Sequence, residues 1–432
     1  MKIVYITAGA AGMFCGSCLH DNRLAAALLA IGEDVVLVPT YTPIRTDETD
    51  VSYRGIFLGG INVFLQQKSA IFRHVPAWFS RLLDRPQLVD WLARRAAATH
   101  PARLGDLTVS MLEGIDGRQR REFHRLVRWI AEEMRPDVVH LSNTLLTGLV
   151  RPLREVLDVP LVGSVSGEDS FVEKLPEPNR RAARDKLAKN CRPFDALVAM
   201  NVYYADFMSD YLSMPRSRIH VIRHGLRLDG YGDRSSKTVR GGSRTIGYLA
   251  RICPDKGLHL LVDAYVRLLR DPEMHDVELR VAGYVGRGER EYLETQLRKL
   301  RTAGRDGACH YVGEVTREEK RAFLESLDLF CLPTAYRESK GIPAIEALAS
   351  GVPIVVPAHG CFPELVEATG GGLLFEPFDI EGLVDRLRRL LRQDELARQL
   401  GRQGRQAVQA IYHDRRMADE TRQLYRKLID AR

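Results

Sequence analysis

The stretch Y-R-E-S-K-G-I-P-A-I-E-A-L-A-S-G-V-P at 336–353 contains two glutamates, Glu338 and Glu346, with seven residues between them. Pro343 suits the first turn of a helix and Gly351 suits its end, so Glu338 is expected in a loop and Glu346 just inside a helix. The free N–H groups at a helix start attract an anion such as a phosphate. Carboxylates beside a phosphate site are unusual unless they bind hydroxyls. A sugar and a ribose joined by a pyrophosphate supply both kinds of group.

A matching stretch lies about eighty residues earlier and reads T-I-G-Y-L-A-R-I-C-P-D-K-G-L-H-L-L-V-D-A-Y at 245–265. Its start, 245–250, is short and apolar and predicts a strand, and a helix with one apolar face follows. That face consists of Leu258, Leu261, Val262, Tyr265 and Leu269. Arg251 ends the strand and Lys256 opens the helix. Two cations at the C-terminal edge of a strand suit a diphosphate, and open α/β sheets bind ligands at this edge.

The two stretches resemble retaining nucleotide-sugar glycosyltransferases, specifically glycosyltransferase family 4. The residues that carry the resemblance are A-R-x-x-P-x-K-G at 250–257 and E-x7-E at 338–346, and G-C-F-P-E-L-V at 360–366 and G-G-L-L-F-E-P at 371–377 agree in order and spacing. Any one element alone also fits a surface helix or an ordinary βα turn, but four elements in register favour the family. The resemblance is strongest over residues 220–412. It implies an α/β fold of the GT-B kind, with two Rossmann-like domains facing each other across a cleft.

The alternation of apolar strands and helices along the chain predicts parallel sheets with right-handed crossovers. Strands are expected at 2–8, 35–38, 136–141, 159–165, 195–200, 218–225, 245–250, 277–282, 309–312, 329–332 and 353–356, and one helix from Leu19 to Ile31. The N-terminal domain is predicted to span 1–228, with a helix at 413–432 crossing back to it. The polar, Gly- and Ser-rich segment 229–244 is the expected linker, and 245–412 is the expected donor domain.

Bulk properties suit a two-domain enzyme of 432 residues with a net charge of +7. Nucleic acid is disfavoured as a partner because no zinc-finger, helix-turn-helix or RNA-sheet signature appears. Seven cysteines, an odd number, favour reduced thiols and a cytoplasmic location. Residues 66–129 mix Trp and Phe with many Arg; this segment is either a helix pair covering the sheet, the favoured interpretation, or an element that contacts an anionic membrane at its inner face.

The glycine-rich turn at 9–16 does not have the G-x-G-x-x-G spacing, so a dinucleotide site is disfavoured. In the resembled family the equivalent loop lies against the donor phosphate and the acceptor. Gly12 and Gly16 would allow the backbone to approach both groups closely. The resemblance therefore places these two glycines among the substrate-binding residues.

Polar and thiol side chains surround this turn. His20, Asp21 and Asn22 either point toward the site or, for Asp21 and Asn22, cap the following helix. Cys15 and Cys18 have a C-x-x-C spacing, but four zinc ligands are hard to assemble, and packing of two small residues is the favoured interpretation.

The chain departs from the family pattern at Ser166, where many members carry a His that contacts the transferred sugar. Either the Ser166 hydroxyl makes this contact, or Glu168 or Asp169 takes part. His140 ends a strand, and a hydrogen bond at the core edge is as well supported as a site role.

Two further positions differ from the family. His224 stands where Asn is usual and could serve the hinge between domains. Lys340 replaces an aromatic residue, either to recruit an anionic group or as a solvent-facing side chain. No D-x-D pair is present, so no divalent metal is expected, and no cofactor beyond the nucleoside diphosphate sugar.

The resemblance implies transfer of a sugar, of the hexosyltransferase type, from a nucleoside diphosphate sugar to an acceptor hydroxyl with retained anomeric configuration. The acceptor would be a glycan, a lipid-linked molecule or a small molecule. Catalytic roles fall on Arg251, Lys256 and Glu338; Glu346 would bind the ribose, and the remaining donor contacts are assigned to Ser339, Lys340, Gly341, Ile342, Gly313 and Val315. The alternatives are a sugar-nucleotide epimerase of the same fold and a catalytically silent binding protein.

Overall fold

The computed structural model describes residues 1–9, 16–54, 57, 104–231, 243–304 and 306–432. The chain folds into two compact units. Unit 1 comprises Met1–Gly225 together with Asp414–Arg432, and unit 2 comprises Leu226–His413. The first unit is therefore discontinuous in sequence, and the second is inserted before its last helix. The expected boundary at 228/229 lies a few residues beyond the division at Gly225.

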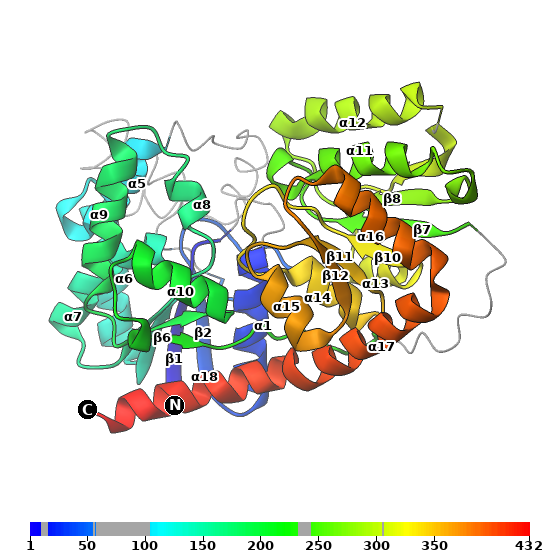
Figure 1. The fold of residues 1–432 in the computed structure, drawn as a ribbon. Helices are drawn as coiled ribbons and strands as arrows, with labels where there is room; N and C mark the ends of the chain where they lie inside the picture. The colour runs from blue at the N-terminus through cyan, green and yellow to red at the C-terminus, as the bar shows by residue number, and fades with distance from the viewer. Residues whose placement is uncertain (10–15, 55–56, 58–103, 232–242, 305) are drawn as a thin grey trace. The chain divides into compact units, whose positions relative to one another are not determined.

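Unit 1 contains a six-stranded parallel sheet in the order β2-β1-β3-β4-β5-β6 (Figure 1). Its strands are β1 (Lys2–Thr7), β2 (Asp34–Pro39), β3 (Val138–Leu141), β4 (Leu161–Ser164), β5 (Ala196–Ala199) and β6 (Ile219–Val221). Its α-helices are α1 (Gly16–Ala30), α5 (Gly105–Glu113), α6 (Arg120–Trp129), α7 (Val150–Val156), α8 (Asp169–Val172), α9 (Asn179–Cys191), α10 (Val202–Tyr211) and α18 (Asp414–Asp430).

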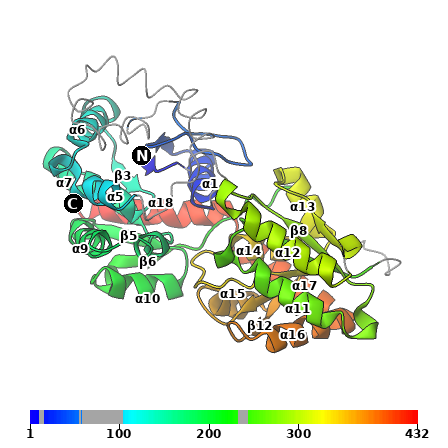
Figure 2. The ribbon, with the colours of Figure 1, turned by 90° about the horizontal axis from the view of Figure 1, so that it is seen from above.

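Both faces of this sheet are covered, because successive residues of its strands are mostly apolar and buried. In β1, Ile3 and Tyr5 belong to one core cluster, and Val4 and Ile6 belong to another. Successive side chains of a strand point to opposite faces, so the two clusters lie on opposite sides of the sheet. The first cluster includes residues of α1 and α18, which contact each other and lie next to each other in both views (Figures 1 and 2). Helices α5 to α7, α9 and α10 contribute to the second cluster.

Unit 2 has a second six-stranded parallel sheet, in the order β12-β11-β10-β7-β8-β9. Its strands are β7 (Thr245–Leu249), β8 (Glu278–Ala282), β9 (Cys309–Tyr311), β10 (Leu329–Cys331), β11 (Ile354–Pro357) and β12 (Gly372–Phe375). Its α-helices are α11 (Leu258–Leu268), α12 (Arg290–Thr302), α13 (Arg317–Glu325), α14 (Ile342–Ala349), α15 (Phe362–Thr369), α16 (Ile380–Arg392) and α17 (Asp394–Ile411). Helices lie against both faces of the sheet (Figure 1): α11 packs with α12 and α16, and α14 packs with α13 and α17.

The predicted α/β fold with two Rossmann-like domains is confirmed, and the expected strands match β1 to β11 within a few residues. Strand β12 was not predicted as a strand, because G-G-L-L-F was read only as a family motif. Helix α1 begins at Gly16, three residues before the predicted Leu19. Asp21 and Asn22 therefore lie inside the helix, and the prediction that they cap it is wrong.

Several sequence predictions fall on residues outside the described ranges. These are Gly12, Cys15, the aromatic residues of segment 66–129 up to residue 103, and residues 232–242 of the expected linker 229–244. Within the described part of that segment, Trp129 ends α6 with 9% of its surface exposed and lies 4.5 Å from the Phe57 ring, centroid to centroid. Trp129 is therefore a core residue. No helix among the described residues is both long and apolar enough to span a bilayer.

Candidate active site

The candidate site is built at the C-terminal edge of the unit 2 sheet. Because all strands of this sheet are parallel, their C-terminal ends share one edge. The loops after β7, β9 and β10 lead respectively to Arg251, to Gly313 and to Glu338. Arg251 and Glu338 thus follow the ends of two neighbouring strands, β7 and β10, and Gly313 follows β9, which β8 separates from β7.

Glu338 is the centre of a buried hydrogen-bond network. The Lys256 Nζ donates to Glu338 Oε2 at 2.6 Å and to Tyr336 Oη at 2.7 Å. The Tyr336 hydroxyl donates to the same Glu338 oxygen at 2.6 Å, and the backbone N–H of Lys340 donates to Oε1 at 3.2 Å. The Lys256 ammonium also lies 4.8 Å from the centroid of the Tyr336 ring. The network holds the predicted catalytic Glu338 and Lys256 in one ion pair.

The electrostatics of this network favour a charged carboxylate beside a neutral phenol. Burial raises the pKa of the Glu338 carboxyl, but the Lys256 ammonium and the hydrogen bonds from Lys256, Tyr336 and the Lys340 amide outweigh it and lower the pKa to about 2. Burial and the neighbouring Glu338 charge raise the pKa of Tyr336 well above its usual value. Tyr336 therefore remains a hydrogen-bond donor across the ordinary pH range.

Glycines allow the loops of the site to approach one another. Gly360 has a φ of +63°, and a Cβ there would lie 2.5 Å from the carbonyl oxygen and 2.6 Å from the nitrogen of Glu338. Gly257 has a φ of +76°, and a Cβ there would lie 1.7 Å from the carbonyl oxygen of Pro333. These glycines belong to two of the quoted motifs, so close backbone packing explains their presence.

Glu346 belongs to a second buried ion pair. Its Oε1 accepts from the Nζ of Lys320 at 2.8 Å, and the two side chains are 4% and 8% exposed. Lys320 comes from α13, so two helices position this carboxylate. Neither Lys320 nor Tyr336 was predicted as a site residue. Tyr336 stands two positions before Glu338 in the quoted stretch, whereas Lys320 lies in a charged E-E-K-R run without a distinguishing signal.

The remaining donor-side residues surround the start of α14. Gly341, with a φ of +68°, is the residue before this helix, and Ile342 is its first residue, so both contribute N–H groups of the first turn. Ser339 is buried and Lys340 is half-buried. Arg251 is exposed two residues beyond the end of β7.

Gly313 and Val315 are half-buried and lie between β9 and α13. Gly313 has a φ of +83°, and its carbonyl accepts from the N–H of Gly283 at 2.8 Å. The loop that follows β9 is thus fastened to the loop that follows β8.

In unit 1, the loop after β4 is held by carboxylates. Glu168 accepts from the N–H and the hydroxyl of Thr144, at 2.9 and 2.7 Å, and from the N–H of Ser166 at 2.5 Å. Asp169 accepts from the hydroxyl of Tyr204 at 2.5 Å. Both carboxylates are therefore engaged within unit 1, whereas the Ser166 hydroxyl makes no hydrogen bond to another residue in the part of the chain that the structure describes. Gly16, the other described substrate-binding candidate of this unit, begins α1.

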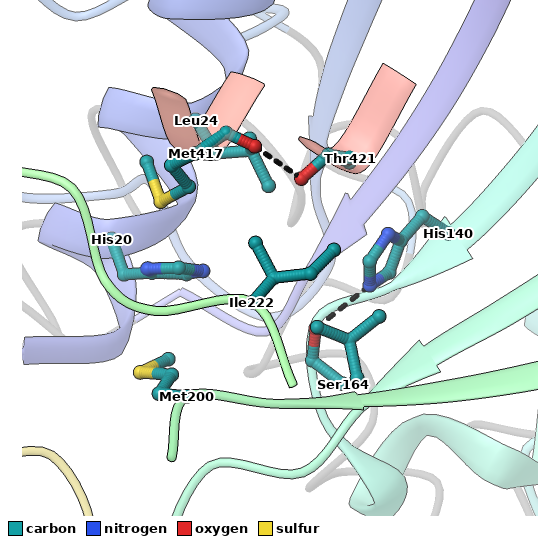
Figure 3. A pocket seen from close by; sticks show the side chains of 9 residues that line it. His20, Leu24, His140, Ser164, Met200, Ile222, Met417 and Thr421 are labelled. Atoms are coloured by element: carbon teal, nitrogen blue, oxygen red, sulfur yellow. Dashed lines mark hydrogen bonds between the residues drawn. The ribbon is translucent and has the colours of Figure 1, made fainter. Parts of the chain in front are cut away.

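A small cavity inside unit 1 is lined by histidines from α1 and β3 and by residues of α18 (Figure 3). His140 bonds Ser164 Oγ through Nε2 at 2.7 Å and the hydroxyl of Tyr425 through Nδ1 at 2.5 Å. Burial, together with the nearby His20, lowers the pKa of His140 to about 3. His140 thus makes hydrogen bonds in the core, which was one of the two roles considered for it, beside a role in the site.

His224 is also buried and belongs to a polar chain in this unit. The Arg23 Nη1 lies 3.2 Å from His224 Nε2, and His224 Nδ1 lies 2.8 Å from His20 Nδ1. Because a guanidinium only donates, Nε2 of His224 accepts, so its Nδ1 carries the proton and donates to His20. Asp21 accepts from Thr7 at 2.5 Å and anchors α1 to β1.

Comparison with known proteins agrees with this architecture. A family model described as glycosyl transferases group 1 matches residues 233–407, and one described as glycosyltransferase family 4 matches residues 105–229. The MMP alpha-(1->4)-mannosyltransferase of Mycolicibacterium hassiacum is 29% identical over 307 residues, which cover 68% of this chain and 71% of that protein.

Two solved structures share the fold. Sucrose-phosphate synthase from Thermosynechococcus elongatus superposes with a TM-score of 0.72 at 17% identity, with 100% of each chain covered. The Anabaena protein Alr3699/HepE, solved in complex with UDP and glucose, superposes with a TM-score of 0.68 at 16% identity, covering 99% of this chain and 100% of that one. Two parallel α/β units of this kind define the GT-B class. The chain belongs to glycosyltransferase family 4.

Proposed function

We propose that this glycosyltransferase moves a sugar from a nucleoside diphosphate sugar to an acceptor hydroxyl, with retention of anomeric configuration and without a metal ion. The observation that carries the proposal is the Lys256–Glu338–Tyr336 network beside the first turn of α14. It combines a cation, a carboxylate and unpaired helix amides at the C-terminal edge of a parallel sheet. The UDP and glucose bound to the Anabaena protein of the same fold support a donor of this class.

The difficult step is cleavage of the bond between the anomeric carbon and the phosphate oxygen, because negative charge builds on the leaving pyrophosphate. Arg251, Lys256 and the N–H groups of Gly341 and Ile342 would stabilise that charge through fixed dipoles and cations. Removing one such group raises a barrier by about 2–4 kcal/mol. The leaving phosphate itself would accept the proton of the acceptor hydroxyl.

The two glutamates have different roles in this proposal. Glu338 would accept hydrogen bonds from hydroxyls of the transferred sugar, and Glu346 from those of the ribose. A carboxylate suits both tasks because it accepts several hydrogen bonds at once. The charged state of Glu338 is secured by its lowered pKa of about 2.

Binding and turnover of three variants test these assignments. Thermal shifts with UDP, GDP, ADP and dTDP first identify the nucleotide; a ligand at a hundred times its Kd adds about 2.7 kcal/mol of stability. Lys256→Ala and Glu346→Gln should each weaken nucleotide binding about tenfold or more. Glu338→Gln should bind the nucleotide normally but transfer sugar at least a hundredfold more slowly.

Two results would refute this site. Unchanged nucleotide affinity in both Lys256→Ala and Glu346→Gln would remove the donor-binding roles, and full turnover by Glu338→Gln would remove its sugar role. Analysis of the product tests the reaction class, because a transferase yields a glycoside, with the configuration of the donor if retention holds, whereas an epimerase releases a free epimer.

A further inference from the structure

Lys320 lies on the buried side of α13 and is 6% exposed. Its ammonium contacts Glu346, the residue proposed above to bind the ribose, with a distance of 2.8 Å from Nζ to Oε1. We infer that Lys320 is a positioning residue for the nucleotide, which holds the Glu346 carboxylate in the orientation that accepts from the ribose hydroxyls. This inference rests on the proposed function, because it concerns how the assigned ribose acceptor is held.

The charges of the pair explain why Glu346 needs such a partner. Glu346 is 3% exposed and has lost most of its hydration, and an isolated buried carboxylate is strongly disfavoured. The Lys320 ammonium supplies the opposite charge within hydrogen-bond distance. A carboxylate can accept from both hydroxyls of a diol when its two oxygens are held in a fixed orientation. The contact with Lys320 fixes one of the two Glu346 oxygens.

Hydrogen bonds at the start of α13 fix the helix that carries Lys320. The helix begins with a capping box, in which Thr316 accepts from the N–H of Glu319 and Glu319 accepts from the N–H of Thr316. Arg317 donates from Nη2 to the carbonyl of Arg227 at 2.8 Å and so fixes the first turn. The loop with Gly313 and Val315, to which donor contacts are assigned, leads directly into this helix. One helix thus links these predicted donor contacts and the predicted ribose contact.

A purely structural ion pair is the alternative, and it predicts a different pattern of affinities. Loss of a structural pair would weaken binding of every nucleotide to the same extent, or leave all of them unchanged. Loss of a support for the ribose acceptor would weaken ribonucleotides only. A nucleotide without ribose hydroxyls therefore separates the two explanations.

The experiment measures Kd by calorimetry for UDP, GDP and ADP, each against its 2′,3′-dideoxy counterpart, and continues with the pair of the tightest binder. Wild type should prefer the ribonucleotide by about tenfold to a hundredfold, the range of hydrogen bonds to a charged group. Lys320→Met should lose most of this preference while its affinity for the dideoxy nucleotide changes less than about twofold. Lys320→Arg, which keeps the charge, should regain part of the preference.

Two further variants serve as controls for Lys320→Met. Lys299→Met removes an ion pair with Asp263 in the same unit, where both side chains are exposed, 43% and 40%, and it should change neither affinity. The double variant Lys320→Met/Glu346→Gln has no unpaired buried charge, so it also serves if Lys320→Met alone does not fold. If Lys320 acts through Glu346, the double variant should bind like Glu346→Gln.

The possible failures are distinguishable. A Glu346→Gln variant that keeps the full ribose preference would overturn the proposed ribose role itself. A Glu346→Gln variant that loses the preference, combined with a Lys320→Met variant that keeps it or that weakens both nucleotides equally, would overturn only the role of Lys320. A double variant with a weaker ribose preference than Glu346→Gln would also overturn only the role of Lys320.

Discussion

Glu338 shares one of its oxygens with two donors, Lys256 and Tyr336, at 2.6 Å each. These two hydrogen bonds fix the position of the Glu338 carboxylate. The network also leaves Lys256 partly neutralised by Glu338 in the structure. A donor pyrophosphate would therefore share the ammonium with a carboxylate that is already in place.

Replacing Tyr336 by Phe removes a hydroxyl that both donates to Glu338 and accepts from Lys256. The loss of this hydrogen bond should lower kcat about tenfold, or by ~1–1.5 kcal/mol, with nucleotide Kd unchanged within twofold. Because the Tyr336 hydrogen bond lowers the pKa of Glu338, the acid limb of the pH–rate profile should also move to higher pH. Steady-state kinetics from pH 8 down to about pH 3 measure both effects.

Tyr265→Phe is the control for this variant, because the Tyr265 hydroxyl donates to the carbonyl of Val277, at the opposite end of the sheet. Its kcat and its pH–rate profile should match the wild type. A Tyr336→Phe enzyme with the same properties would show that the phenol does not position Glu338.

His140 makes unit 1 sensitive to acid. Its pKa of about 3 in the folded state lies below the usual value of 6.5, so between these pH values the unfolded chain binds a proton that the folded chain does not. Below pH 6.5 the free energy of unfolding should fall by up to about 1.4 kcal/mol per pH unit from this group, and above pH 6.5 the group should have no effect. Urea unfolding of unit 1 can be monitored by hydrogen exchange in β3 at several pH values. The free energy of unfolding should depend less steeply on pH in His140→Gln than in the wild type.

His124→Gln replaces an exposed histidine of the same unit and should retain the wild-type slope. An identical slope in the His140→Gln variant would mean that other groups dominate the acid response of unit 1.

At the scale of elements, the loop before α15 acts as the backbone support of Glu338. The Cys361 N–H donates to the carbonyl oxygen of Glu338 at 2.8 Å, and Gly360 leaves no room for a side chain against that same backbone. The motif at 360–366 therefore packs directly against the E-x7-E motif at 338–346. It fixes the backbone position of Glu338.

Gly360→Ala should displace the Glu338 loop, because the new Cβ would meet backbone atoms at 2.5–2.6 Å and the φ of +63° is unfavourable for alanine. We expect a loss of about 1–3 kcal/mol in stability and a loss of transfer activity of at least tenfold. Gly304→Ala is a matched control, since its φ is +68° and a Cβ there would meet nothing within 4 Å. Only the stability loss should appear in the control; equal activity losses in both variants would exclude the clash as the cause.

The sequence predicted these elements well where apolar strands alternate with helices, since both sheets are buried on both faces and periodicity is strong. It missed β12 because G-G-L-L-F was interpreted only as a family motif, and the pairing with β11 that makes this segment a strand is not visible in the sequence. It missed Lys320 because a lysine in a charged run is usually solvent-exposed, and only the packing of α13 against α14 brings it to Glu346. Contacts made across elements leave little trace in local sequence.

At the scale of the whole molecule, α18 completes the core of a unit that begins at the other end of the chain. Met417, Ala418, Leu424 and Tyr425 of this helix are buried in the same cluster as Ile3 and Tyr5 of β1. The Tyr425 hydroxyl also bonds His140, and the sulfur of Met417 accepts from the N–H of Gly225.

Truncation after His413 should therefore unfold unit 1 and spare unit 2. The truncation deletes three large buried side chains of α18, and losing their burial, worth about 1.5–3 kcal/mol each, removes roughly 5–9 kcal/mol, which is comparable to the stability of many domains. Limited proteolysis should degrade 1–225 rapidly while a fragment starting near Leu226 survives and still binds the nucleotide. A protease-resistant unit 1 in the truncated protein would contradict this expectation.

The position of α18 also sets the order in which the protein matures on the ribosome. N-terminal domains usually finish first during synthesis, but here the first 225 residues must wait for a helix that is translated after all of residues 226–413. Unit 2 can complete its core while unit 1 is still unfinished. Nascent chains would thus expose the apolar side chains that α18 covers until residues 414–430 emerge, and chaperones would be most needed during this period.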